Sequence, residues 1–190
     1  MEVQNLYWTW NKSLSLKFCD DIIKFAKSKR KNRAKVFLDE GSKARRSNII
    51  WLRDEKWIYR ELQYYLKAAN KKAKWNFDVN SAEACQFTIY ENNQYYDWHI
   101  DMFTEPKEKN TNRKISLTLC LSDSNEYEGG DLQFHPDSNP NEEQKIITSE
   151  NFRNKGSVVL FPSFVWHRVT PVTKGKRYSL VVWYNGPSFK

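Results

Sequence analysis

The spacing of apolar residues predicts a helix near the start of the chain. Cys19, Ile22, Ile23 and Ala26 fall at positions i, i+3, i+4 and i+7, which places their side chains on one face of an α-helix. Ser15 stands before them, and a serine at this place can accept a hydrogen bond from a free backbone N–H group of the first turn. We therefore expect an amphipathic helix that begins after Ser15.

A second helix is predicted by the same spacing between residues 54 and 70. Its apolar stripe consists of Ile58, Leu62, Tyr65, Leu66 and Ala69. Asp54 is the expected N-cap, and Asn70 with the lysines after it is expected to end the helix. The residues between the two helices are polar and basic, and we interpret them as a loop.

From about residue 82 the apolar residues occur in short runs of the kind found in β-strands. The expected strands cover residues 84–90, 115–121, 131–134, 157–161, 167–170 and 177–184. Two long polar segments, 103–112 and 135–154, separate some of these runs. Because polar loops of this length are uncommon in compact domains, we interpret both segments as lids or disordered loops.

These elements predict a mostly β fold with packed helices, namely a double-stranded β-helix, or jelly roll, with an N-terminal helical layer. At 190 residues the chain has the length of a single domain. Within it, residues 1–80 are expected to form the helical support and residues 81–190 the jelly-roll core.

Composition and charge disfavour several classes of protein. The chain has no run of eighteen apolar residues that could span a bilayer, and its start does not resemble a signal peptide. We therefore expect a soluble, cytoplasmic protein. The three cysteines, Cys19, Cys85 and Cys120, lack the spacing of a zinc knuckle, and we expect buried thiols rather than disulfides. The net charge of +8 is scattered along the chain, which favours a solvated surface over a nucleic-acid interface.

Two of the three histidines occur where they could bind a metal ion. His99 and Asp101 are two residues apart, and in a β-strand such residues point to the same face. His167 could be a third ligand, although a lone histidine in an apolar stretch is more often part of the core. Two histidines and one carboxylate together form the facial triad of non-haem iron(II) sites. His135 stands in a polar segment and is not expected to bind the metal.

An arginine ten residues past His167 predicts a binding site for an anion. Arg177 leads a run in which Ser179, Val181 and Trp183 share its strand face. A guanidinium in an apolar strand needs an anionic partner, and a dicarboxylate co-substrate would accept two parallel bonds from Arg177 and a third from Ser179. Without the three metal ligands, an exposed or structurally paired arginine would be the preferred interpretation.

Four segments of the second half carry a resemblance to a known family: residues 90–101, 113–123, 128–132, which read Glu-Gly-Gly-Asp-Leu, and 155–184. In them the chain resembles the 2-oxoglutarate and iron(II)-dependent oxygenase superfamily, near its prolyl 4-hydroxylase-like and PKHD-type hydroxylases. The sequence Arg-Arg-Ser at 45–47 is similar to these proteins in a less distinctive way. Asn93 departs from the glycine of the family's turn, and Arg177 in place of lysine favours the PKHD-like branch.

By this resemblance, His99, Asp101 and His167 are the iron ligands and Arg177 binds the distal carboxylate of 2-oxoglutarate. The resemblance also implies that Tyr90, and with it Ser116, reaches the same carboxylate. The implied cofactors are Fe(II), 2-oxoglutarate and O2, with ascorbate as a further candidate. The implied activity is hydroxylation of an unactivated C–H bond in a prolyl or other residue of a peptide.

Other functions stay open. The substrate could instead be a free amino acid or another small molecule, and the domain could be a binding module without catalysis, although it keeps every residue of the site. Nucleic-acid demethylases of the superfamily have a second arginine where this chain has Trp183, and halogenases lack the carboxylate that Asp101 supplies. Trp98, Trp166 and Trp183 are candidate pocket walls, but as aromatic residues each is more often simple core. Neither a nucleic acid nor a membrane is an expected partner.

Overall fold

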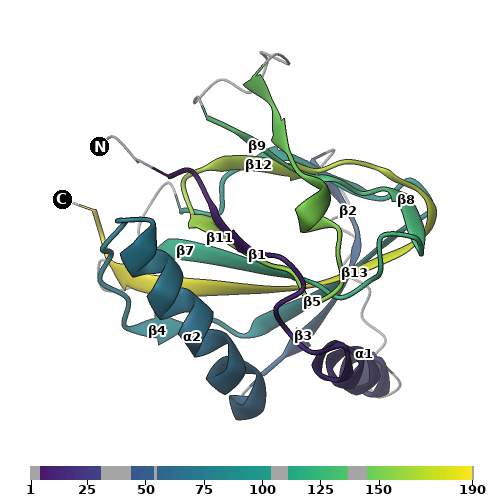
Figure 1. Ribbon diagram of the computed structural model, residues 1–190, viewed down its shortest axis with the longest axis horizontal. Helices are drawn as coiled ribbons and strands as arrows, with labels where there is room; N and C mark the ends of the chain where they lie inside the picture. Colours follow the sequence, from purple (N-terminus) through teal and green to yellow (C-terminus); the bar gives the residue numbers. More distant parts are fainter. Residues whose placement is uncertain (1–4, 31–43, 54, 104–110, 137–144, 190) are drawn as a thin grey trace.

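The computed structural model describes residues 5–30, 44–53, 55–103, 111–136 and 145–189. Within these ranges it contains two α-helices, α1 (Leu16–Arg30) and α2 (Lys56–Lys72), and two antiparallel sheets that face each other. The helices lie on the outer side of the larger sheet (Figure 1). The predicted mostly β jelly roll with a helical layer is therefore confirmed.

The larger sheet has the strand order β1 (Trp8–Trp10), β11 (Val158–Pro162), β7 (Thr111–Cys120), β13 (Val172–Pro187), β5 (Cys85–Glu91) and β3 (Asn48–Leu52). Two short strands, β4 (Ser81–Ala82) and β8 (Tyr127–Gly129), also pair with β13. The smaller sheet has the order β10 (Ile147–Thr148), β9 (Leu132–His135), β12 (Trp166–Val169), β6 (Tyr95–His99) and β2 (Arg45–Arg46).

The helices bury the stripes that the sequence indicates. Cys19, Ile22 and Ala26 of α1 are fully buried, and the Ser15 hydroxyl accepts a hydrogen bond of 3.2 Å from the backbone N–H group of Phe18, which confirms the predicted cap. Helix α2 ends at Lys72, one of the lysines that follow Asn70, as predicted. The predicted cap of this helix, Asp54, lies outside the described residues.

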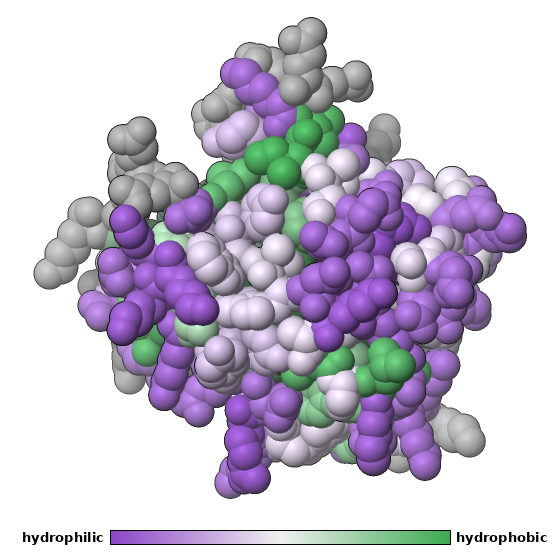
Figure 2. Space-filling view, in the orientation of Figure 1, coloured by the Kyte–Doolittle hydropathy of each residue, from purple (hydrophilic) through white to green (hydrophobic). Residues whose placement is uncertain are grey.

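Two hydrophobic clusters hold the layers together. The first fills the space between the helices and the larger sheet, with Ile22 and Leu62 from the helices and Phe87 and Leu119 from the sheet. The second lies between the two sheets and is built around aromatic residues such as Phe134 and Phe161. Hydrophilic side chains cover most of the face seen in Figure 2, with hydrophobic residues in smaller areas between them.

Several predicted details are wrong. Residues 1–80 are not only helical, because β1 and β3 belong to the larger sheet and β2 belongs to the smaller one. Strands β2 and β3 occupy part of the segment that we interpreted as a loop. The segment 135–154 contains β10 and a short 3-10 helix (Glu150–Phe152), and His135 ends β9 with 1% of its surface exposed. Residues 111–112 of the other predicted lid begin β7, and residues 104–110 and 137–144 lie outside the described residues.

The structure also tests the expectations about the cysteines and about membrane-spanning segments. Cys19, Cys85 and Cys120 are buried and free, as predicted. Within the described ranges, neither helix is long and apolar enough to cross a membrane.

Candidate functional site

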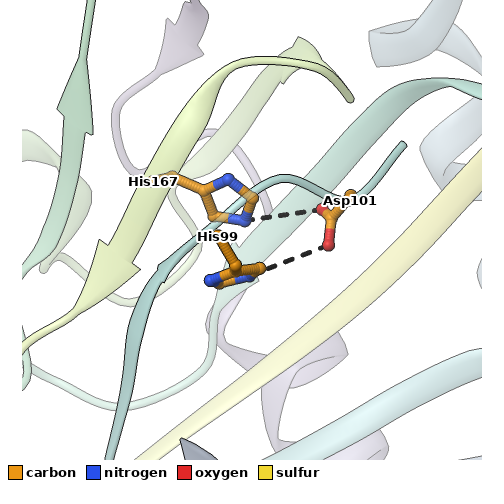
Figure 3. Close-up of side chains that lie close together, drawn as sticks. All are labelled: His99, Asp101 and His167. Carbon is orange, nitrogen blue, oxygen red and sulfur yellow. Dashed lines mark ion pairs between the residues drawn. The ribbon is translucent and has the colours of Figure 1, made fainter. Parts of the chain in front are cut away.

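Three predicted ligands meet between the sheets. His99 ends β6 and His167 lies on β12, where the two residues are direct cross-strand partners. Asp101 follows β6 after a bend, so it does not share a strand with His99 as the spacing argument assumed. The three side chains nevertheless point toward one another, and their donor atoms all lie within 4.8 Å of one another (Figure 3).

Backbone carbonyl groups orient both imidazole rings. The Nδ1 atom of His99 is 2.7 Å from the carbonyl oxygen of Asp97, and Nδ1 of His167 is 2.9 Å from that of Val165. Because a carbonyl oxygen only accepts, Nδ1 carries a proton in each ring, and Nε2 is the nitrogen that faces Asp101. The two Nε2 atoms lie 3.8 and 3.5 Å from the carboxylate oxygens of Asp101. Both histidines therefore present the atom that a metal ion needs.

The carboxylate of Asp101 is fixed from the opposite sheet. Ser116, at the centre of β7, donates a hydrogen bond of 2.6 Å to Oδ2 of Asp101, and its oxygen lies 3.0 Å from the hydroxyl of Ser163. The backbone N–H groups of Asp101 and Met102 donate to the carbonyl oxygen of Ser163, each at 2.8 Å. Ser116 is therefore hydrogen-bonded to the candidate ligand Asp101. A contact between Ser116 and the co-substrate stays a prediction.

The electrostatics of the site favour a neutral His99 and an ionised Asp101. Burial lowers the pKa of His99 to about 3, and the neighbouring His167 acts in the same direction. Burial would raise the pKa of Asp101, but His167, His99 and the hydrogen bond from Ser116 hold it below its ordinary value. Metal ligands must be deprotonated, so these protonation states suit a divalent cation.

A cavity beside the triad contains the predicted anion site. Its lining combines the three candidate ligands with inward-facing residues of both sheets: Gln86, Tyr90, Tyr96, Thr118, Leu132, Val169, Arg177, Ser179, Val181 and Trp183. The shared strand face predicted for Arg177, Ser179, Val181 and Trp183 is thus the face that lines the cavity. The described lining does not include Trp98 or Trp166.

Arg177 is the unusual member of this lining. It is 2% exposed, and its Nη1 atom donates to the Ser179 hydroxyl at 3.2 Å. Among the described residues, no carboxylate lies within ion-pair distance of its guanidinium. Tyr90 is its direct cross-strand partner, with the ring centre 5.6 Å from the guanidinium carbon. Burial raises the pKa of Tyr90, so its hydroxyl stays protonated and can donate a hydrogen bond to an anion.

Two further contacts were not predicted as parts of the site. The ring of Tyr96 stacks on the ring of His99 with 3.4 Å between the ring centres. The guanidinium carbon of Arg45 lies 4.6 Å from the centre of the Tyr96 ring. Arg45 belongs to the sequence at 45–47, which resembles the family weakly, and Tyr96 belongs to the matching segment 90–101, but neither residue was assigned a role. Tyr96 lines the cavity beside His99, and Arg45 packs against the ring of Tyr96.

A second group that was not predicted packs against Trp183, which lines the cavity. The guanidinium of Arg113 donates two hydrogen bonds of 2.6 Å to the carboxylate of Glu83, and it stacks 3.9 Å from the ring centre of Trp183. Nothing in the sequence pairs Glu83 with Arg113, because the two residues are thirty positions apart. The pair fixes one face of Trp183.

The donor set fits a divalent metal ion. Two imidazoles and one carboxylate would leave coordination positions toward the cavity, where a 2-oxo acid could bind the ion while its far end approaches Arg177. A buried arginine with an open side toward the cavity suits a carboxylate, since the planar fork can donate two parallel hydrogen bonds.

Comparison with known families finds a match over most of this region. The sequence model described as "2OG-Fe(II) oxygenase superfamily" matches residues 85–185, which include the three candidate ligands and Arg177. A PKHD-type hydroxylase of Teredinibacter turnerae is 35% identical over 100 residues, which cover 52% of this chain. The match spans only 41% of that relative's length.

Solved structures share the fold over nearly the whole chain. A viral collagen prolyl hydroxylase from Paramecium bursaria Chlorella virus-1, solved as a complex with 2OG, superposes with a TM-score of 0.71 at 20% identity and covers 96% of this chain and 97% of its own. A prolyl hydroxylase of Trichoplax adhaerens in complex with a hypoxia-inducible factor peptide gives a TM-score of 0.63 at 19% identity, covering 95% and 83%.

Proposed function

The chain belongs to the 2OG-Fe(II) oxygenase superfamily, and from this premise we propose that it is a hydroxylase that uses iron(II), 2-oxoglutarate and O2 on a prolyl or other residue of a peptide. One observation carries the proposal: the candidate triad and a buried arginine without a described carboxylate partner line the same cavity. The names of the similar proteins favour a peptidyl substrate, since two of them are prolyl hydroxylases.

Each residue of the site has a distinct task under this proposal. His99, Asp101 and His167 hold the iron, and Ser116 keeps the Asp101 carboxylate in its orientation. Arg177 pairs with the distal carboxylate of 2-oxoglutarate. Tyr90 and Ser179 are placed beside Arg177 to donate further hydrogen bonds to that carboxylate.

The bound iron, with 2-oxoglutarate and O2, supplies the oxidising chemistry, in which the oxo acid becomes succinate and CO2 and one oxygen atom enters the substrate C–H bond. The protein's contribution is orientation and exclusion of water. Leu132, Val169 and Val181 give the cavity apolar walls, and the ring of Trp183, held by Arg113, closes one side.

A small-molecule substrate is the second candidate within this family, and ascorbate stays a candidate reductant. Base demethylation is disfavoured, because Trp183 lies in the cavity at the position where the demethylases of the superfamily have a second arginine. A cytoplasmic location also stays a prediction.

The test is a turnover screen with purified protein, Fe(II) and 2-oxoglutarate. Succinate release is measured with proline-containing peptides, with free amino acids and without substrate, and products are examined by mass spectrometry for one added oxygen atom. We expect release that depends on a peptide and is lost in the His167→Ala variant. Release driven only by free amino acids would replace the peptide proposal, and a protein without any iron-dependent release would refute the enzymatic one.

A further inference from the structure

A tight turn lies directly behind Arg177. It consists of residues 127–131, here called the support turn, and it runs from β8, which pairs with β13 just before Arg177, to the start of β9. Its two glycines, Gly129 and Gly130, have positive φ angles of 72° and 66°, a conformation that residues with side chains rarely adopt. The metal and its ligands do not explain why the turn has this shape.

Gly130 leaves the space in which the stem of Arg177 lies. A Cβ atom on Gly130 would be 2.9 Å from Cδ of Arg177 and 2.7 Å from Cγ2 of Val172. Both separations are shorter than real Cβ contacts, so any side chain at this position would displace one of the two neighbours. The aliphatic part of Arg177 therefore packs against the bare Cα of Gly130. This contact sets the direction in which the guanidinium enters the cavity.

Arg153 fastens the support turn from another segment. It follows the 3-10 helix of residues 150–152 and donates from Nη1 to the carbonyl oxygen of Gly129 at 2.7 Å and to the carboxylate of Asp131. Its Nη2 atom donates to the carbonyl oxygen of Tyr127 at 3.0 Å, and the guanidinium lies 4.5 Å from the centre of the Tyr127 ring. A planar fork with several partners holds a turn more firmly than a single ion pair does.

We propose that the support turn is a positioning device for the co-substrate, in which Gly130 gives Arg177 its place and Arg153 holds the turn. The inference rests on the proposed function, because it assigns the turn to the arginine that binds the distal carboxylate. Gly130 and Arg153 are positioning residues, since the described cavity lining includes neither of them. The device selects 2-oxo acids that carry a second carboxylate, and it leaves iron binding to the triad.

The test measures binding rather than turnover. Iron-loaded protein is titrated without O2 with 2-oxoglutarate, and complex formation is followed by its visible absorption. The same titration uses pyruvate, which has the same 2-oxo acid end but no distal carboxylate. We expect Gly130→Ala to raise the dissociation constant for 2-oxoglutarate about ten-fold, part of the effect of a lost charge-assisted contact, with unchanged affinity for pyruvate and for iron. Arg153→Lys should act in the same direction and stays informative if Gly130→Ala does not fold.

Two control variants separate positioning from general damage. Gly156 also has a positive φ angle, of 82°, and a Cβ there would be 2.4 Å from the carbonyl oxygen of Leu14, so Gly156→Ala introduces similar strain away from Arg177. It should lower the melting temperature and leave the affinity for 2-oxoglutarate unchanged. Lys174 forms an exposed ion pair with Glu128 of the support turn. Lys174→Ala should change neither the melting temperature nor the affinity for 2-oxoglutarate.

The outcomes are distinct. If Gly130→Ala and Arg153→Lys both bind 2-oxoglutarate as the wild type does, the inference is wrong while the proposed function stands. It is also wrong if Gly156→Ala weakens binding as much as Gly130→Ala, or if Gly130→Ala weakens binding further in a protein that already carries Arg177→Ala. A wild type that binds iron but not 2-oxoglutarate would overturn the proposed function, and the inference with it.

Discussion

Replacing Arg177 by lysine should weaken the use of 2-oxoglutarate without disturbing the metal. Arg177 is 2% exposed and its guanidinium is already bonded to Ser179, so it presents a fixed planar fork to the cavity. A lysine keeps the positive charge but offers a single ammonium group in place of two parallel donors. Loss of a charge-assisted contact costs about 1.5 to 3 kcal/mol, which corresponds to roughly a ten-fold to hundred-fold higher apparent Michaelis constant for 2-oxoglutarate.

Arg177→Ala should be worse, because a carboxylate would then be buried without its partner. The assay is succinate formation against the concentration of 2-oxoglutarate at saturating iron, with metal content determined on the same samples. Lys176→Ala is the matched control: Lys176 is the neighbour on the same strand, and its side chain is 57% exposed and pairs with Glu91 outside the cavity. If both Arg177 variants keep the wild-type concentration dependence, Arg177 is only structural and the co-substrate assignment fails, even if the iron site stands.

The other predictions concern the metal centre. Asp101→Ala should abolish succinate formation and lower iron content, whereas Asp101→Glu should retain iron with poor turnover, since the carboxylate moves by one methylene; full activity of the alanine variant would refute the triad. Ser116→Ala removes the 2.6 Å hydrogen bond to Asp101 and should weaken iron binding by about ten-fold, measured by competition with a chelator; unchanged affinity would make Ser116 a packing residue only. In the metal-free protein, His99 has a pKa of about 3 against an ordinary value of 6.5, so the unfolded state takes up this proton first. Stability should fall as the pH drops from about 6.5 toward 3, by up to about 1.4 kcal/mol per pH unit, and a His99→Gln variant in denaturant titrations should lose most of this dependence.

The sequence predicted those parts of the fold that depend on local periodicity. The stripe of α1 and the alternating face of β13 are read from neighbours within one element, and both are present in the structure. Short edge strands such as β1 were missed. Strand β1 is held by its pairing with β11, in which Trp8 lies opposite Leu160, a residue far along the chain. A three-residue strand has too few residues to show a period of its own.

The candidate site could be predicted only as a set of residue types. The structure shows that Asp101 meets the two histidines through a bend that follows β6, a geometry that the spacing of two residues did not require. The partnership of Glu83 and Arg113 depends on how β5 and β7 lie on either side of β13. Such contacts follow from strand order, which the pattern of apolar residues does not specify.

Strand order also determines how the metal centre and the anion site are placed relative to each other. The two histidines belong to the smaller sheet, while Arg177 and Ser116 belong to the larger one. Ser116 reaches across and bonds to Asp101, so one hydrogen bond links the metal ligands to the sheet that carries the arginine. A molecule that binds both ends of the cavity must match the separation of the two sheets, which the aromatic cluster around Phe134 and Phe161 maintains. The length of the co-substrate is therefore specified by the packing between the sheets, and its chemical nature by the side chains that face each other across it.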